Sequence, residues 1–288
     1  SLGLTLLVFI PSLSLQSGGA TRWILLGPFS FQPAEFLKIA FIIYLATWLS
    51  GIKEKTNTIK YGLIPFLVIL GISGIVLLAQ PDTSTFLIMG SSGIAMYFVG
   101  GGKWKHIFII GLIAILGLFI MASTKPYIKE RVMTFINPSA NGLSSGYQIQ
   151  QSLIAIGSGG LTGRGFGQSI QKFNFLPEPM GDSIFAVAAE EFGFIGSVIL
   201  LLFFVAFSIQ GLKIAARTKD SFGRLLVVGI VILIITQSFL NMSSMLGVLP
   251  LTGTPLPFVS HGGTALLVTL AQVGIILNVS KQAPKLVA

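Results

Sequence analysis

Eight apolar segments, each long enough to cross a bilayer as a helix, dominate this chain of 288 residues. A helix needs about 20 predominantly apolar residues to span the hydrocarbon core of a membrane. Only 9% of the residues are charged, which is far below the content of soluble domains. The sequence therefore predicts an all-α polytopic integral membrane protein. The candidate spans lie near residues 1–16, 33–50, 61–80, 84–101, 105–122, 183–211, 222–243 and 263–280.

Positive charge is concentrated in every second connection between these segments. Cytoplasmic loops of membrane proteins carry an excess of Lys and Arg, so the pattern predicts that these connections are cytoplasmic and that the others face outward. The net charge of +9 thus reflects topology, and a nucleic-acid ligand is not expected. The basic residues concerned are Lys53, Lys55, Lys60, Lys103, Lys105, Lys213, Arg217, Lys219, Arg224, Lys281 and Lys285.

The remaining composition excludes several kinds of site. The chain has no cysteine and only two histidines, His106 and His261, which argues against a disulfide framework, a thiol nucleophile and a His-rich metal site. Ser1 opens the sequence inside an apolar run without a basic region, so we expect part of a longer protein rather than a signal peptide. No repeat or linker divides the chain, and a single membrane domain over residues 1–288 is predicted.

One stretch, residues 123–191, is polar and contains five of the nine acidic residues. Most of it, about residues 123–182, forms a long outward connection between the fifth and sixth spans. Apolar residues recur within it at Ile149, Leu153 and Ile156, which favours an ordered half-buried helix or re-entrant element. If this protein is an enzyme, its chemistry is expected here. The five acids are Glu130, Glu178, Asp182, Glu190 and Glu191.

Ionisable residues in or near apolar helices are expected to have an ion-pair or hydrogen-bond partner or a functional role, because burying a charge in a membrane costs free energy. Glu35 and Lys38 are three residues apart on one helix face and could form an ion pair. A structural and a functional role for this pair are both open. Asp82 precedes a helix start and could be an N-cap, and Asp182 has the same alternative. Asp182 and Glu190 are also spaced to share one helix face about 12 Å apart, although Glu190 could simply bind a buried Arg or backbone.

A glycine-rich run, GSGGLTGRGFGQS, lacks the pattern of a nucleotide-binding loop. With Arg164 and Lys172 it could contact an anionic head group, but a solvated turn explains it equally well. Ser260 and His261 are sequence neighbours, and adjacent side chains rarely point at one another. A serine hydrolase site is therefore not predicted.

Four long motifs resemble those of the SEDS proteins, the RodA/FtsW group of peptidoglycan glycosyltransferases. The longest is SGYQIQQSLIAIGSGGLTGRGFGQSIQKFNFLPEPMGDSIFAVAAEEFGFIG. GGATRWILLGPFSFQPAEFLKIA, LAQPDTSTF and LPLTGTPLPFVSHGGTALL match the other outward motifs of the family in order and spacing. Family members usually have ten membrane helices, so the resemblance implies that the first two lie outside this sequence.

The resemblance implies a polymerase that transfers lipid-linked disaccharide units from lipid II and releases undecaprenyl pyrophosphate. Asp182 matches the aspartate proposed as the catalytic base of the family. The site is expected on the extracytoplasmic side of the bacterial cytoplasmic membrane. The residues expected to contact substrate are Arg22, Glu35, Lys38, Asp82, Arg164, Lys172, Glu178 and Ser260.

Other expectations also come from the resemblance. The expected partners are a class B penicillin-binding protein and other membrane proteins of the division or elongation machinery. No resident cofactor is predicted, although a divalent cation could be held mainly by the pyrophosphate. The family often has His and Thr just before the catalytic aspartate, whereas this chain has Met180 and Gly181, which puts any role of those side chains in doubt. Ser84 and His261 are further departures from the family pattern.

Two other functions stay open at this point. A transporter could use the intramembrane Glu35, Lys38 and Glu190 to move a lipid-linked precursor across the bilayer. A non-catalytic membrane scaffold would bind a partner helix instead. The sequence likewise does not distinguish roles in elongation, division and sporulation, although the sequence of the outer loop resembles FtsW slightly more.

Overall fold

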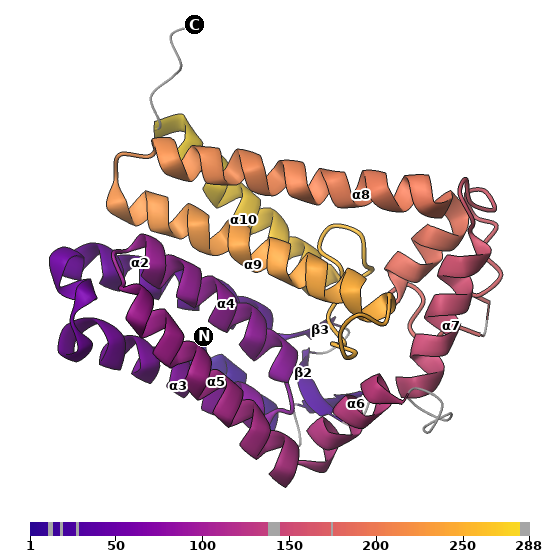
Figure 1. Ribbon diagram of the computed structural model, residues 1–288, viewed down its shortest axis with the longest axis horizontal. Helices are drawn as coiled ribbons and strands as arrows, with labels where there is room; N and C mark the ends of the chain where they lie inside the picture. The colour runs from indigo at the N-terminus through magenta and orange to yellow at the C-terminus, as the bar shows by residue number, and fades with distance from the viewer. Residues whose placement is uncertain (11–13, 18–19, 27–28, 138–144, 174, 283–288) are drawn as a thin grey trace, which may run out of the picture. The chain divides into compact units, whose positions relative to one another are not determined.

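The computed structural model describes residues 1–10, 14–17, 20–26, 29–137, 145–173 and 175–282 (Figure 1). Contacts within the chain group these residues into two compact units. The first unit comprises Ser1–Ile113, Ser208–Thr236 and Gly263–Ala288, and the second comprises Ala114–Phe207 and Gln237–Gly262.

Most of the described chain is helical, as predicted. Six helices are long and apolar enough to cross a membrane, and a seventh apolar helix, α4 (Thr83–Val99), has 17 residues. This confirms a polytopic helical membrane protein but not the count of eight spans. The six spans are α2 (Pro33–Ile52), a π-helical turn with α3 (Ile59–Leu63 and Ile64–Ala79), α5 (Trp104–Thr124), α8 (Ile184–Arg217), α9 (Ser221–Met245) and α10 (Gly263–Gln282).

The first predicted span, residues 1–16, does not form one long helix. It contains the short helix α1 (Leu2–Leu6), a 3-10 turn (Leu7–Phe9) and the beginning of strand β1 (Ser14–Ser17). Ile10 is extended, in keeping with the bias against helix at a residue that precedes proline. The apolar composition of this segment was therefore a poor guide to its secondary structure.

A small antiparallel sheet departs from the prediction of an all-α fold. Strand β1 pairs with β2 (Ala20–Leu26), and β2 pairs with β3 (Phe29–Phe31), in the order β1–β2–β3. Its residues lie in the first outward connection and the end of the predicted first span. Strand β3 ends two residues before Pro33 begins α2.

The core of the first unit is built from packed apolar helices. Helix α4 packs against α2 and α3, and α10 packs against α2 (Figure 1). Ile42 and Leu45 are fully buried on α2. A Cβ built on Gly93 of α4 would lie 3.1 Å from the ring of Phe41, so this glycine lets α2 and α4 approach closely.

The second unit contains the helices of the polar stretch and the first part of α8. Helices α6 (Pro126–Ile136) and α7 (Ser145–Ser158) contact each other, and α7 confirms the predicted ordered helix in this connection. Ala155 of α7 is buried with Leu176, Ala186 and Val187 in one apolar cluster. This cluster anchors α7 against the beginning of α8 (Figure 1).

Candidate active site

Asp182 lies in the turn that leads into α8. The amides of Gly181 and Ser183 both donate to the carbonyl of Glu178, at 3.0 and 3.2 Å. The carbonyl of Ser183 accepts from the amide of Val187, so Ser183 takes the N-cap position that was one alternative for Asp182. Because α8 begins at Ile184, Asp182 lies before the helix. The prediction that Asp182 and Glu190 share one helix face was therefore wrong.

The main chain around Asp182 is fixed by hydrogen bonds from α9 and the connection that follows it. The three consecutive carbonyls of residues 180, 181 and 182 each accept one hydrogen bond. In the same order, the donors are the amide of His261 (2.8 Å), Oγ of Ser260 (2.7 Å) and Nδ2 of Asn241 (2.8 Å). The turn that carries the candidate base is therefore held by three separate contacts with one part of the chain.

A cation that is not among the predicted site residues, Arg131, lies near the Asp182 carboxylate. A Cβ built on Gly253 would lie 3.5 Å from both Oδ2 of Asp182 and Nη2 of Arg131, so the two charged groups face the same small space. Arg131 donates from Nη1 to the carbonyl of Thr252 at 3.4 Å. Its guanidinium carbon also lies 4.4 Å from the centre of the Tyr127 ring, within the range of a cation–π contact.

One sequence signal could have identified Arg131. Tyr127, Arg131 and Thr134 are separated by four and three residues, which places them on one face of α6. Thr134 is buried. The spacing thus places Arg131 on the same face of α6 as Thr134, which the structure shows to be buried.

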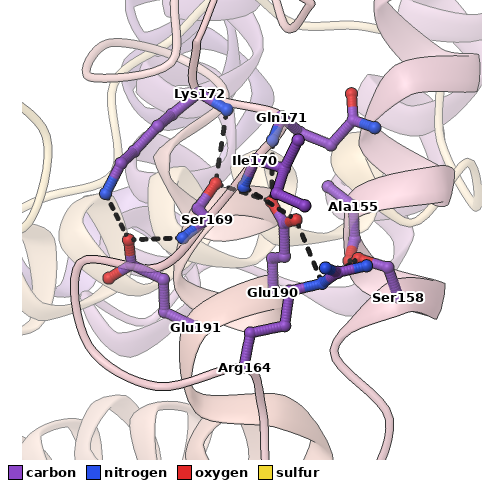
Figure 2. Close-up of polar contacts among 9 residues, drawn as sticks. All are labelled: Ala155, Ser158, Arg164, Ser169, Ile170, Gln171, Lys172, Glu190 and Glu191. Atoms are coloured by element: carbon purple, nitrogen blue, oxygen red, sulfur yellow. Dashed lines mark hydrogen bonds and ion pairs between the residues drawn. The ribbon is translucent and has the colours of Figure 1, made fainter.

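Glu190 is fully buried and holds a loop against α8 through its carboxylate (Figure 2). Its oxygens accept from Oγ of Ser169 at 2.6 Å and from the amides of Ile170 and Gln171 at 3.1 and 3.2 Å. Nε of Arg164 lies 3.4 Å from the same carboxylate. The alternative that Glu190 binds backbone is confirmed, whereas the Arg beside it is exposed and not buried as expected.

Glu191 makes a second set of contacts with the same loop (Figure 2). Its Oε1 accepts from Nζ of Lys172 at 2.7 Å and from the amide of Ser169 at 3.3 Å. The carbonyls of Glu190 and Glu191 accept from the amides of Arg164 and Gly165, both at 3.0 Å. We call Glu190, Glu191 and the loop residues 159–172 the clasp.

The two cations that were expected to contact an anionic head group are both part of the clasp. Arg164 and Lys172 each contact a carboxylate of the protein. Their contact with substrate stays a prediction. The run itself is a loop that approaches α8 closely, since a Cβ on Gly159 would lie 2.1 Å from the carbonyl oxygen of Ala189. Glu178, by contrast, has an exposed side chain and contributes its carbonyl to the Asp182 turn.

The remaining candidates lie in the first unit. Nζ of Lys38 and Oε1 of Glu35 are 2.8 Å apart and both side chains are buried, which confirms the predicted ion pair. Asp82 is the N-cap of α4, because its carboxylate accepts from the amide and hydroxyl of Thr85 at 3.2 and 2.8 Å. Arg22 donates to the carbonyls of the two residues just before Asp82. Contact of these residues with substrate stays a prediction.

Metal binding has a limited set of donors. Among the residues that the structure describes, no group of three or more His, Asp or Glu side chains could hold a metal ion. The expectation that a divalent cation is held mainly by the pyrophosphate stays a prediction.

The fold and the site together define a helical membrane protein that presents an acid on a fixed turn at the beginning of a long helix. The family model described as "cell cycle protein", which covers FtsW, RodA and SpoVE, matches residues 1–285. The chain belongs to this family.

Relatives with curated names agree with this placement. Stage V sporulation protein E of Bacillus subtilis (strain 168) is 41% identical over 278 residues, which cover 96% of this chain and 76% of that protein. A probable peptidoglycan glycosyltransferase FtsW of Geobacter sp. (strain M18) is 41% identical over 277 residues, with the same coverage of both chains.

Solved structures share the fold. A chain from a structure described as "structural coordination of polymerization and crosslinking by a peptidoglycan synthase complex" matches with a TM-score of 0.80 and 28% identity, covering 99% of this chain and 79% of that one. The crystal structure of the rod shape determining protein RodA of Thermus thermophilus matches with a TM-score of 0.69 and 27% identity, covering 99% and 76%.

Proposed function

We propose that the chain is a peptidoglycan glycosyltransferase that extends glycan strands from lipid II, with Asp182 as its general base. The observation that carries the proposal is the position of the Asp182 carboxylate, which faces the same space as Arg131 from a turn fixed by three hydrogen bonds. The family membership and the names of the relatives support the reaction.

The proposed reaction is one inverting displacement. The Asp182 carboxylate accepts the proton of the acceptor sugar hydroxyl while that oxygen attacks the anomeric carbon of the donor. The bond between this carbon and the pyrophosphate oxygen breaks, and its electron pair leaves with undecaprenyl pyrophosphate. The α linkage of the donor thus becomes the β linkage of the product.

Negative charge develops on the pyrophosphate as it leaves, and a fixed cation nearby would stabilise it. Arg131 is suited to this role because a guanidinium stays protonated and can bind two phosphate oxygens at once. Its contacts with Tyr127 and the Thr252 carbonyl restrict its orientation. We therefore add Arg131 to the predicted substrate-contacting residues.

The proposed setting is the extracytoplasmic face of the bacterial cytoplasmic membrane, where glycan strands grow. The structural relative in a peptidoglycan synthase complex supports a partner that crosslinks the product, and we propose a class B penicillin-binding protein. The activity assay therefore includes this partner.

Polymerisation of lipid II by the purified full-length protein with its penicillin-binding partner tests the function. Asp182→Ala should lower the rate by roughly 100-fold to 10,000-fold, the usual contribution of a general base. Asp220→Ala is the matched control, because Asp220 accepts from the amide of Gly223 at the start of α9, in a loop predicted to be cytoplasmic. It should keep the parental rate.

The same assay separates the alternatives. A wild-type protein that moves lipid II across vesicle membranes without making polymer would support the transporter. A protein that only recruits its partner, and whose Asp182→Asn variant is tolerated in cells, would support the scaffold. Retained polymerisation by Asp182→Ala would reject Asp182 as the base.

A further inference from the structure

We propose that Asn241 is a positioning residue that fixes the Asp182 turn in its reactive geometry; this inference rests on the proposed function of Asp182. Asn241 lies on α9 and is fully buried. Its Nδ2 donates to the carbonyl of Asp182 at 2.8 Å and to the carbonyl of Thr254 at 2.8 Å. One side-chain amide therefore joins the candidate base to the connection that follows α9.

The two contacts require an amide group. Nδ2 carries two protons, and each one is directed to a carbonyl oxygen. The other atom of the amide, Oδ1 of Asn241, is buried and has no hydrogen-bond partner among the described residues. A rotated amide would point this oxygen at two carbonyl oxygens, so the observed orientation is the only favourable one. Leaving Oδ1 unpaired in the interior costs free energy. The two hydrogen bonds donated by Nδ2 offset this cost, which indicates that they are the contribution of Asn241 to the structure.

The connection joined to Asp182 in this way also forms the surroundings of its carboxylate. Gly253 precedes Thr254 and faces both Oδ2 of Asp182 and Nη2 of Arg131. Ser260, further along the same connection, donates to the carbonyl of Gly181. Asn241 thus fixes the position of the Asp182 turn relative to the connection that lies beside its carboxylate. Displacement of a catalytic group by about 1 Å can cost roughly 100-fold in rate.

The chain offers a matched control for this role. Gln237 lies one turn before Asn241 on α9, is also buried, and donates from Nε2 to the carbonyl of Pro255 at 2.9 Å. This bond holds the same connection but does not reach the residues of the Asp182 turn. Removing Gln237 therefore tests whether general loosening of the connection is enough to lower the rate.

The experiment uses the full-length protein with its penicillin-binding partner and lipid II. Asn241→Leu and Gln237→Leu are compared in initial rate over a range of lipid II concentrations. Asn241→Leu should lower kcat by roughly 10-fold to 100-fold and change KM by less than about threefold, because the base and not the bound substrate is displaced. Gln237→Leu should stay within about twofold of the parent in kcat.

A second readout reports the turn itself without activity. Met180 is exposed, and residues 1–288 contain no cysteine, so Met180→Cys can carry a nitroxide label there once any cysteine elsewhere in the full-length protein is replaced by serine. Asn241→Leu should make the label more mobile in the electron paramagnetic resonance spectrum, whereas Gln237→Leu should not. Where Asn241→Leu does not fold, Asn241→Ser replaces it; its single hydroxyl donor should give an intermediate rate and mobility.

The outcomes distinguish this inference from the proposed function. An unchanged label in Asn241→Leu, or equal loss of rate in both variants, overturns the positioning role of Asn241. Retained polymerisation by Asp182→Ala rejects Asp182 as the general base, even where the label is mobile in Asn241→Leu. Loss of rate in Asp182→Ala and Asn241→Leu, with a mobile label only in Asn241→Leu, supports both proposals.

Discussion

Asp182 and Glu190 are two acids of one short stretch, and the structure uses them in opposite ways. The carboxylate of Glu190 is the anchor itself, since it accepts from Ser169 and from two loop amides. At Asp182, the bonds from Asn241 and Ser260 hold main-chain carbonyls of the turn instead. Glu190 therefore stabilises the fold through its carboxylate, whereas Asp182, the proposed base, is held through the main chain of its turn.

This difference was not visible from charge or spacing alone. Both acids follow the same glycine-rich and polar run, and both match the same family motif. Their roles follow from which atoms the surrounding residues contact. Substitution of the two acids should therefore affect different quantities: stability at Glu190 and rate at Asp182.

The largest expected effect on stability is at Glu190. Glu190→Leu removes the acceptor of the Ser169 hydroxyl and of two loop amides, and each of these donors that stays buried and unpaired should cost about 1–3 kcal/mol. Arg164 adds little, because it is exposed and also donates to Ser158. Thermal unfolding in detergent measures the loss. Glu178→Gln, at an exposed acid of the same stretch, is the control and should unfold as the parent does. A parental unfolding temperature for Glu190→Leu would contradict the anchoring role.

A smaller effect, and one on rate more than on stability, is expected at Gly253. The methyl group of Gly253→Ala would contact both Oδ2 of Asp182 and Nη2 of Arg131 at about 3.5 Å. The positive φ of 61° adds a backbone cost of about 1–2 kcal/mol. We expect roughly a tenfold lower rate of polymerisation, because the methyl group fills the space that the carboxylate and the guanidinium both face. Gly157→Ala is the control, since the added methyl of that variant meets open space. A full rate in Gly253→Ala would show that this space is not used.

The smallest effect is expected at the edge of the clasp. Lys172→Met removes the ion pair with Glu191, but the lysine is partly exposed and solvent screens the interaction. The unfolding free energy should fall by at most about 1 kcal/mol, and raising the salt concentration should reduce the difference from the parent. A loss as large as that of Glu190→Leu would mean that Glu191, not Glu190, is the main anchor.

The features that the sequence predicted well depend on neighbouring residues. Membrane helices are read from continuous apolar length, and the Glu35–Lys38 pair follows from a spacing of three within one helix. The N-cap at Asp82 is equally local. The ordered helix α7 was predicted from its apolar periodicity, and its Ile149 is buried.

The features that were missed depend on distant contacts. Glu190 bonds with Ser169, 21 residues earlier, and no periodicity encodes that distance. Arg131 reaches the candidate site only because Gly253, far along the chain, approaches α6. The strands of residues 14–31 were hidden in a segment whose composition favours a membrane helix. Asp182 was selected from a motif, and its distinction from Glu190 required the hydrogen bonds of the structure.

The most direct test of the account is the isosteric variant Asp182→Asn, measured for lipid II polymerisation and thermal unfolding in the same preparation. The amide keeps the shape of the side chain and removes its ability to accept a proton. We expect a rate at least about 100-fold below the parent with an unchanged unfolding temperature. A rate close to the parental one in the folded variant would show that the Asp182 carboxylate is not the general base.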